Sequence, residues 1–300
     1  MKILLLGASG QVGWELQRSL APLGELIMLD RHGTELCGDL GNLPGLAATV
    51  QRVRPDIIVN AAAHTAVDKA ESEPELAHTL NALAPGVLAQ EAAKLGALLV
   101  HYSTDYVFDG SGTRPWLEAD TPAPLNVYGQ SKLEGERLIQ AACPHHLIFR
   151  TSWVYAARGG NFAKTMLRLA QERETLSVIN DQFGAPTGAD LLADISAHAI
   201  FQVMRTPQDV GLYHLVAGGE TSWHGYAKYV IELSQKTSTA MKIVTQTVAP
   251  VASSAFPTPA RRPHNSRLDT TKLQVTFGLQ LPQWQQGVSR MLSEVLLHNT

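Results

Sequence analysis

The sequence has few of the features that mark secreted, membrane or nucleic-acid-binding proteins. Among 300 residues only Cys37 and Cys143 are cysteines, too few for a disulfide framework, which fits a reducing compartment. The first apolar run, residues 3–6, ends at Gly7 and is too short for a signal peptide or a membrane span. With 24 Lys and Arg against 27 Asp and Glu, there is no basic surplus for a nucleic-acid surface. We therefore expect a cytoplasmic protein without a membrane or nucleic-acid partner.

The sequence does contain enough apolar residues, 45% of the chain, to build a large core. In its first half, short uninterrupted apolar runs alternate with longer stretches of helical spacing. This order is typical of an open parallel sheet with helices on both faces. The expected strands are residues 2–6, 26–29, 57–59, 98–102 and 146–150, and the expected helices are residues 12–20, 43–53, 74–95 and 127–142. The predicted fold class is therefore α/β, with a doubly wound, Rossmann-like parallel sheet.

A glycine-rich segment follows the first expected strand and opens the first expected helix. Gly7 permits a tight turn, Gly10 allows the backbone to approach a pyrophosphate closely, and Gly13 lets helix and strand pack together. Free N–H groups at the start of the helix favour the bound anion. Asp30 ends the second strand, where its carboxylate can accept hydrogen bonds from the ribose of NADH, and the adjacent Arg31 can accommodate the extra phosphate of NADPH. The segment predicts dinucleotide binding and leaves the choice of cofactor open.

The character of the sequence changes after about residue 153. The expected helices there are residues 162–171, 191–204, 223–233 and 284–297, and the expected strands are residues 176–179 and 213–216. Residues 250–267 hold four prolines and are the most linker-like part of the chain. We expect a dinucleotide-binding domain over residues 1–155, to which later segments return, and a smaller C-terminal subdomain over residues 156–300 that mainly binds substrate.

Tyr128 and Lys132 carry the chemistry that the sequence indicates. Four residues apart on an expected helix, the phenol and the ammonium project from one face. We expect the cation to lower the pKa of the Tyr128 phenol from its ordinary value of about 10. Thr104 follows the strand that ends at the carboxyl edge of the sheet, where it can donate a hydrogen bond to a substrate carbonyl while Tyr128 supplies a proton. Lys132 would also orient the nicotinamide ribose. The pattern predicts carbonyl reduction by hydride transfer.

The Gly-x-x-Gly-x-x-Gly spacing resembles that of the short-chain dehydrogenase/reductase superfamily, as do Asp39-Leu40 and the small residues at 60–63. Longer segments are similar to one family, the dTDP-4-dehydrorhamnose reductases. These segments are NAAAHTAVDKAESE (60–73), YSTDYVF (102–108), PLNVYGQSK (124–132), RTSWVY (150–155), NDQFGAPTG (180–188) and PTPARRPHNSR (257–267). The resemblance runs nearly end to end. It implies NAD(P)H-dependent reduction of the C4 keto group of dTDP-4-dehydro-6-deoxy-L-mannose to dTDP-L-rhamnose, in the synthesis of bacterial surface polysaccharides such as O antigen.

The resemblance also implies roles for individual residues, with proton donation assigned to Tyr128. The implied cofactor contacts are Gln11, Val12, Asp30, Asp39, Leu40, Ala63, His64, Thr65, Tyr128 and Lys132. The implied contacts to the sugar nucleotide are Thr104, Asp105 and Trp153. The Trp153 ring offers a flat apolar face to a deoxysugar. Either Arg261 or Arg262 could pair with the substrate diphosphate through two parallel hydrogen bonds.

A metal site and the assembly of the chain follow only from the resemblance. Relatives form homodimers bridged by Mg²⁺ through carboxylates, a role that would fall on Glu15, Asp190 and Glu294. Asp190 is one methylene shorter than the Glu expected there, and the role would concern assembly rather than catalysis.

Two alternative functions are compatible with the sequence. One is a nucleotide-sugar epimerase or dehydratase, because dehydratases place acidic groups beside the Thr position and Asp105 follows Thr104. The other is a non-catalytic subunit that binds dinucleotide, like the regulatory subunit of methionine adenosyltransferase, a relative of this family. The presence of both Tyr128 and Lys132 argues against the second alternative.

Overall fold

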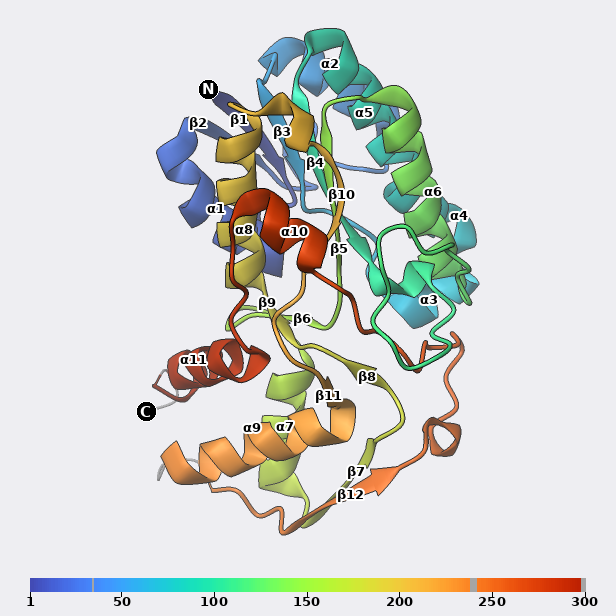
Figure 1. The fold of residues 1–300 in the computed structure, drawn as a ribbon, viewed down its shortest axis with the longest axis vertical. Helices are drawn as coiled ribbons and strands as arrows, with labels where there is room; N and C mark the ends of the chain where they lie inside the picture. The colour runs from blue at the N-terminus through green and yellow to red at the C-terminus, as the bar shows by residue number, and fades with distance from the viewer. Residues whose placement is uncertain (34, 238–241, 298–300) are drawn as a thin grey trace.

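A parallel sheet of six strands forms the centre of the larger part of the molecule (Figure 1). The computed structural model describes residues 1–33, 35–237 and 242–297. The strands of the sheet are β1 (Lys2–Leu6), β2 (Glu25–Leu29), β3 (Ile57–Asn60), β4 (Leu98–Thr104), β5 (His146–Thr151) and β10 (Gly211–His214). They lie in the order β10-β5-β4-β3-β1-β2, and every neighbouring pair is parallel. The uninterrupted apolar runs become strands because both faces of the sheet are buried.

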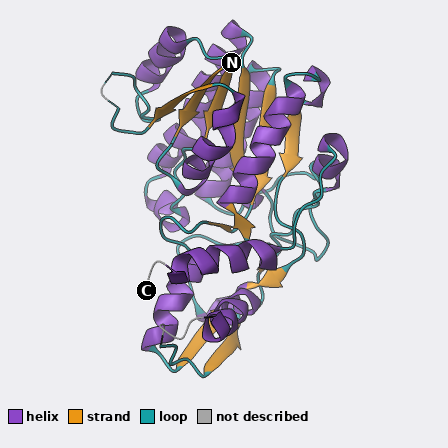
Figure 2. Ribbon diagram, turned by 90° about the vertical axis from the view of Figure 1, so that its left-hand side faces the viewer, coloured by secondary structure: helices purple, strands orange, loops and turns teal. Residues whose placement is uncertain are grey.

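Helices cover both faces of this sheet (Figures 1 and 2). One face carries α1 (Gln11–Leu20), α8 (Ala189–Val203) and α10 (Thr271–Phe277), and the other carries α2 (Leu43–Val53), α5 (Ala84–Leu95) and α6 (Val127–Ala142). Leu16 and Leu192 lie in the core beneath the first face, while Leu46 and Ile139 lie beneath the second. The prediction of a doubly wound α/β fold is confirmed. Among the described helices, none is both long and apolar enough to cross a membrane.

The expected single helix over residues 74–95 is interrupted in the structure. It consists of α4 (Pro74–His78), a π-helical turn (Thr79–Leu83) and α5, and it follows the short helix α3 (Val67–Ser72). Pro85 has no N–H to donate to the carbonyl of Asn81, and its ring would clash with that carbonyl in a regular helix. The wider turn relieves this conflict, and it places the buried Asn81 side chain against the residues that follow β3.

The smaller part of the molecule has a core of its own. It contains α7 (Phe162–Glu172), α9 (Trp223–Thr237) and α11 (Trp284–Leu297), and three strand pairs: β7 (Thr175–Ile179) with β12 (Thr247–Val251), β8 (Phe183–Gly184) with β11 (Thr221–Ser222), and β6 (Val154–Tyr155) with β9 (Thr187–Gly188). Short 3-10 turns lie at Ala21–Leu23, Asp105–Val107, Pro207–Asp209 and Ser253–Ala255. Leu167, Tyr226 and Leu292 bring three helices together in this core. The boundary after residue 155 and the substrate-binding role of residues 156–300 stay predictions; residues 238–241 and 298–300 lie outside the described part.

The expectation of a linker over residues 250–267 is wrong, because this segment is tied to both parts of the molecule. Its first residues belong to β12, where Pro250 is tolerated because β12 pairs only with β7. Further along, the Asn265 carbonyl accepts a hydrogen bond from the Trp116 indole at 3.1 Å, and the His264 carbonyl accepts one from the Phe183 N–H at 2.8 Å. The segment therefore bridges the two parts and cannot move independently of them.

Candidate active site

A cleft of about 620 Å³ opens at the carboxyl ends of the strands, on the side that faces the smaller part of the molecule. Its walls come from the segments that follow five strands of the sheet, β1 to β5, and from α6. The direction in which successive strands are added reverses at β1. The next strand, β2, lies on one side of β1, and β3 lies on the other side. Open α/β sheets bind ligands at this kind of position.

Most of the predicted site residues meet in this cleft. The predicted residues that line it are Gly7, Gly10, Gln11, Val12, Asp30, Arg31, Asp39, Leu40, Ala63, Thr65, Thr104, Asp105, Tyr128, Lys132 and Trp153. Those that do not line it are Gly13, His64, Glu15, Asp190, Glu294, Arg261 and Arg262. Sequence reasoning missed Ser9, Gly38, Val67, Leu80, Tyr102, Ser103, Tyr106, Thr151, Ser152, Val154 and Leu192. Thr151 ends β5 as Thr104 ends β4, and Ser152 follows it, so the rule that indicated Thr104 could have indicated these two residues too.

The glycine loop has the close approaches that its sequence predicts. Gly7 has φ of +78°, and a Cβ there would lie 2.8 Å from the Ala62 nitrogen. A Cβ on Gly13 would lie 2.0 Å from the Gly7 carbonyl oxygen, so only glycine lets α1 pack this closely on the loop. The Ser9 N–H donates to the Asp30 carboxylate at 2.9 Å, which joins the loop to the end of β2. The N–H groups of residues 7–10 are bonded within the loop and to the end of β2, so the cradle that fits a dinucleotide is formed by this loop together with the first turn of α1.

The His64 side chain lies beside this cradle rather than in it. Its ring is buried, with Nε2 3.4 Å from a carboxylate oxygen of Glu73. Its main chain is held in both directions by Asn81, which accepts a hydrogen bond from the His64 N–H at 2.8 Å and donates to the His64 carbonyl at 3.0 Å. The π-helical turn that carries Asn81 therefore fixes the chain that follows β3, including Ala63 and Thr65, which line the cleft.

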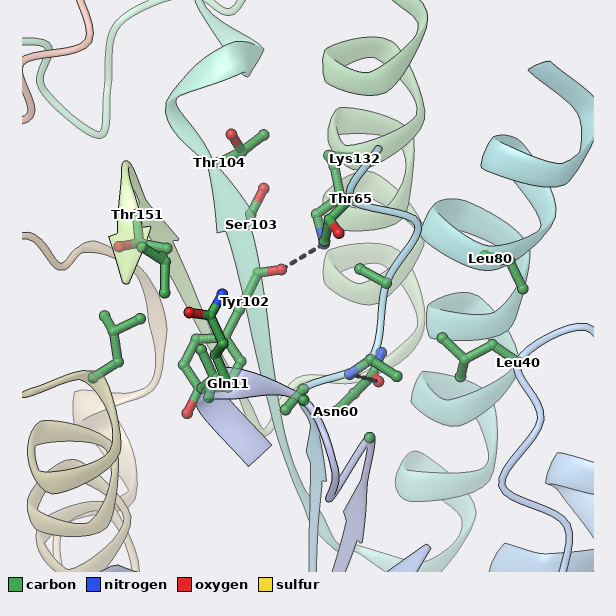
Figure 3. A pocket seen from close by; sticks show the side chains of 18 of the residues that line it. Gln11, Leu40, Asn60, Thr65, Leu80, Tyr102, Ser103, Thr104, Lys132 and Thr151 are labelled. Carbon is green, nitrogen blue, oxygen red and sulfur yellow. Dashed lines mark hydrogen bonds between the residues drawn. The ribbon is translucent and has the colours of Figure 1, made fainter. Parts of the chain in front are cut away.

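The half-buried Tyr128 side chain lines the cleft from α6. Burial raises the pKa of Tyr128 to about 12, and the hydrogen bond with the Thr104 hydroxyl only partly opposes this effect. The expected lowering of this pKa by Lys132 is wrong for this structure, because the Lys132 ammonium group is directed at β4 (Figure 3). Its Nζ donates to the Tyr102 carbonyl at 2.5 Å. The phenol consequently keeps its proton at neutral pH, which is the form that can donate it.

Asp105 is buried beside this pair. Its carboxylate accepts a hydrogen bond from the Thr104 hydroxyl at 3.1 Å, and its side chain is 2% exposed. Burial raises the pKa of Asp105 to about 6, with a hydrogen bond from Ser266 acting in the opposite direction. Thr104 thus lies between the Tyr128 phenol, which is protonated at neutral pH, and the Asp105 carboxyl, which gains its proton only below about pH 6.

This raised pKa predicts a pH dependence of stability. Between its ordinary pKa of 3.8 and the folded value of about 6, Asp105 binds more protons in the folded than in the unfolded state. The free energy of unfolding must then fall as pH rises through this window, by about 3 kcal/mol in total. Asp105→Asn removes this contribution. We expect urea unfolding of wild type and variant at several pH values to show a stability difference that changes by this amount across the window, and a constant difference would contradict the assignment.

The predicted substrate residues divide into two groups. Trp153 lines the cleft, with φ of +51°, and its ring stacks on Trp223 with the ring centroids 3.6 Å apart. Only one face of the Trp153 ring is therefore open to a ligand. Arg261 and Arg262 do not line the cleft. The Arg262 guanidinium is held by both carboxylate oxygens of Asp68, at 2.7 and 3.1 Å, and this pair fastens residues 260–262 to α3.

The three predicted metal ligands do not form a metal site within one copy of the chain. Arg290 lies among them, with Nη1 3.3 Å from Asp190 and Nε 3.5 Å from Glu294. Burial, followed by the charge of Asp190, raises the pKa of the Glu15 carboxyl. A guanidinium thus already supplies positive charge here, and the described residues contain no group of three or more His, Cys, Asp or Glu side chains that could hold a metal ion.

Comparison with known proteins gives one consistent result. The model of the family described as "RmlD substrate binding domain" matches residues 1–297. The chain is 61% identical to a dTDP-4-dehydrorhamnose reductase of Salmonella typhimurium over 300 residues, which are 100% of both chains. A solved dTDP-4-dehydrorhamnose reductase from Clostridium acetobutylicum is 35% identical, with a TM-score of 0.89 and coverage of 98% of this chain and 99% of that one. Another, from Bacillus anthracis in complex with NADP, is 36% identical, with a TM-score of 0.87 and the same coverage. The chain belongs to the dTDP-4-dehydrorhamnose reductase family.

Proposed function

We propose that this protein reduces the C4 keto group of dTDP-4-dehydro-6-deoxy-L-mannose to give dTDP-L-rhamnose, with NADPH or NADH as the hydride donor. The observation that carries the proposal is that Thr104, Tyr128 and Lys132 line the same cleft as the glycine loop. Family membership supplies the substrate class. Asp30 and Arg31 both line the cleft at the end of β2, which supports the use of either cofactor.

The residues of the cleft account for the proton and for the developing charge. Bound reduced nicotinamide supplies the hydride. The Tyr128 hydroxyl supplies the proton that the new alkoxide needs, and its high pKa ensures that the proton is present at neutral pH. Thr104 lies beside the phenol, and by turning its hydroxyl away from Asp105 it can donate to the same substrate oxygen. The open face of Trp153 and the Asp105 carboxyl complete the sugar site.

The decisive experiment measures cofactor consumption together with the product. The protein is incubated with the 4-keto sugar nucleotide and NADPH, the absorbance of the reduced nicotinamide is followed, and the product mass is determined. We expect one NADPH to be oxidised for each product molecule, which gains two hydrogens. An isomer of unchanged mass, formed without cofactor consumption, would indicate an epimerase. Binding of NADPH without turnover would indicate a regulatory subunit. Assembly as a homodimer, a magnesium ion between its copies and a cytoplasmic location stay predictions.

A further inference from the structure

Three buried polar side chains, one each on β3, β4 and α6, contact one another in a row. Asn60 and His101 are register partners on the neighbouring strands β3 and β4, and Lys132 reaches them from α6. The Asn60 Nδ2 lies 3.2 Å from the His101 Nδ1, and the His101 Nε2 lies 3.1 Å from the Lys132 Nζ. The three residues are only 1 to 2% exposed. His101 itself does not line the cleft.

The hydrogen bonds fix the position of the proton on the His101 ring. The Ala62 N–H donates to the Asn60 Oδ1 at 3.2 Å, so the Asn60 amide turns its Nδ2 toward His101. The His101 Nδ1 must therefore accept, which leaves the proton of the neutral ring on Nε2. Burial, followed by the charge of Lys132, lowers the pKa of His101 well below its ordinary value and keeps the ring neutral.

This tautomer points an N–H group at Lys132. An ammonium has three donors and no lone pair, so the contact between Nε2 and Nζ is a hydrogen bond only when the Lys132 amine is neutral. The amine can then accept from the His101 Nε2–H while it donates to the Tyr102 carbonyl. Burial independently lowers the pKa of Lys132 to about 8.

We propose that His101, oriented by Asn60, is a positioning residue whose hydrogen bond favours the neutral amine of Lys132 over the ammonium in the cofactor-free protein. The inference deepens the proposed function and rests on it for the importance of Lys132. Among the described residues, the charged group that faces Lys132 is Glu136, one turn along α6, which favours the ammonium. Its carboxylate is already bonded at both oxygens to Arg150 on β5, so it cannot neutralise a second cation fully.

Protonation of the Lys132 amine then requires a rearrangement of hydrogen bonds that extends to the cofactor cleft. The His101 Nε2 proton passes to the Lys132 amine, His101 takes a proton from solvent at Nδ1, and the Asn60 amide rotates to accept from it, for a net uptake of one proton. The rotation breaks the bond from the Ala62 N–H, and Ala62 is the residue against which Gly7 packs. The charge on Lys132 is thereby linked to the backbone that forms the dinucleotide cradle.

The test is an NMR titration of lysine ¹³Cε signals in the cofactor-free protein, with Lys132 assigned by its absence in Lys132→Met. We expect Lys132 to titrate at least about one pH unit below an ordinary lysine. His101→Gln, whose amide oxygen can accept from an ammonium, should raise its pKa by about one unit or more. Asn60→Asp should act in the same direction, because a carboxylate draws the ring proton to Nδ1. The control is His146→Gln, the same change at a histidine at the start of β5, which should leave the titration unchanged.

Lys132 titrating like an ordinary lysine in wild type, or identically in His101→Gln, would overturn the proposal. If a variant does not fold, the ¹⁵N shifts of the His101 ring in wild type decide the matter, since a proton on Nδ1 is incompatible with the inference. These measurements involve no turnover. A reductase with an ordinary Lys132 would therefore refute only this inference, and an inactive protein with the expected titration would refute only the proposed function.

Discussion

Replacing Tyr128 with phenylalanine is expected to lower kcat for ketone reduction by about 100-fold or more, the effect of removing a positioned general acid. The phenol lines the cleft beside Thr104, and because its pKa lies well above 7 it carries its proton at neutral pH. Its removal leaves the glycine loop and the end of β2 untouched. The variant should therefore bind NADPH as wild type does, which fluorescence titration of the reduced cofactor can measure alongside kcat.

Tyr102→Phe is the matched control for this experiment. Tyr102 also lines the cleft, but its hydroxyl is bonded to the Ser196 hydroxyl at 2.6 Å and is therefore not free for a substrate. Its carbonyl, which binds Lys132, is unaffected by the substitution. We expect kcat of this variant to stay within about threefold of wild type. An unchanged kcat in Tyr128→Phe would remove Tyr128 from the mechanism, and equal losses in both variants would point to general damage to the cleft.

The parts of this structure that the sequence predicts are those set by local pattern. The apolar run that forms β3 lies where it is expected because a strand buried on both faces needs no polar residue. Gly13 is predictable for a similar reason, since it makes room for the Gly7 carbonyl six residues away, and Gly7 is predictable because the tight turn gives it a positive φ. The order of strands and helices then determines which edge of the sheet carries the cleft.

The parts that the sequence does not predict depend on partners far along the chain. The spacing of Tyr128 and Lys132 on one helix suggests an interaction between them, yet the lysine is directed at the main chain and a histidine of β4. Arg262 looks free in a proline-rich segment, but Asp68, 194 residues away, binds its guanidinium. Spacing within one element cannot reveal either partner, because each depends on how separate elements pack.

Glu136→Gln is expected to lower the free energy of unfolding by about 3–5 kcal/mol, because it leaves a buried cation without its counter-charge. The Arg150 guanidinium binds the Glu136 carboxylate through two hydrogen bonds, at 2.6 and 2.9 Å, and both side chains are at most 4% exposed. The Ser103 hydroxyl donates to the same carboxylate, and the Phe108 ring lies 5.0 Å from the guanidinium carbon. No solvent is available to replace the lost charge. Urea unfolding at neutral pH measures the effect.

The exposed pair of Arg168 and Glu172 is the control that separates the effect of burial from the effect of losing an ion pair. Its guanidinium and carboxylate also bond at 3.0 and 3.1 Å, but both residues are open to solvent, so Glu172→Gln should cost at most about 1 kcal/mol. Combining Glu136→Leu with Arg150→Met removes both buried charges, and this double variant should be more stable than Glu136→Gln because no charge is left unpaired. If Glu136→Gln and Glu172→Gln had equal effects on the free energy of unfolding, water would have to reach the Arg150 guanidinium. The buried pair beside Ser103 and Lys132 would then not be shielded from solvent.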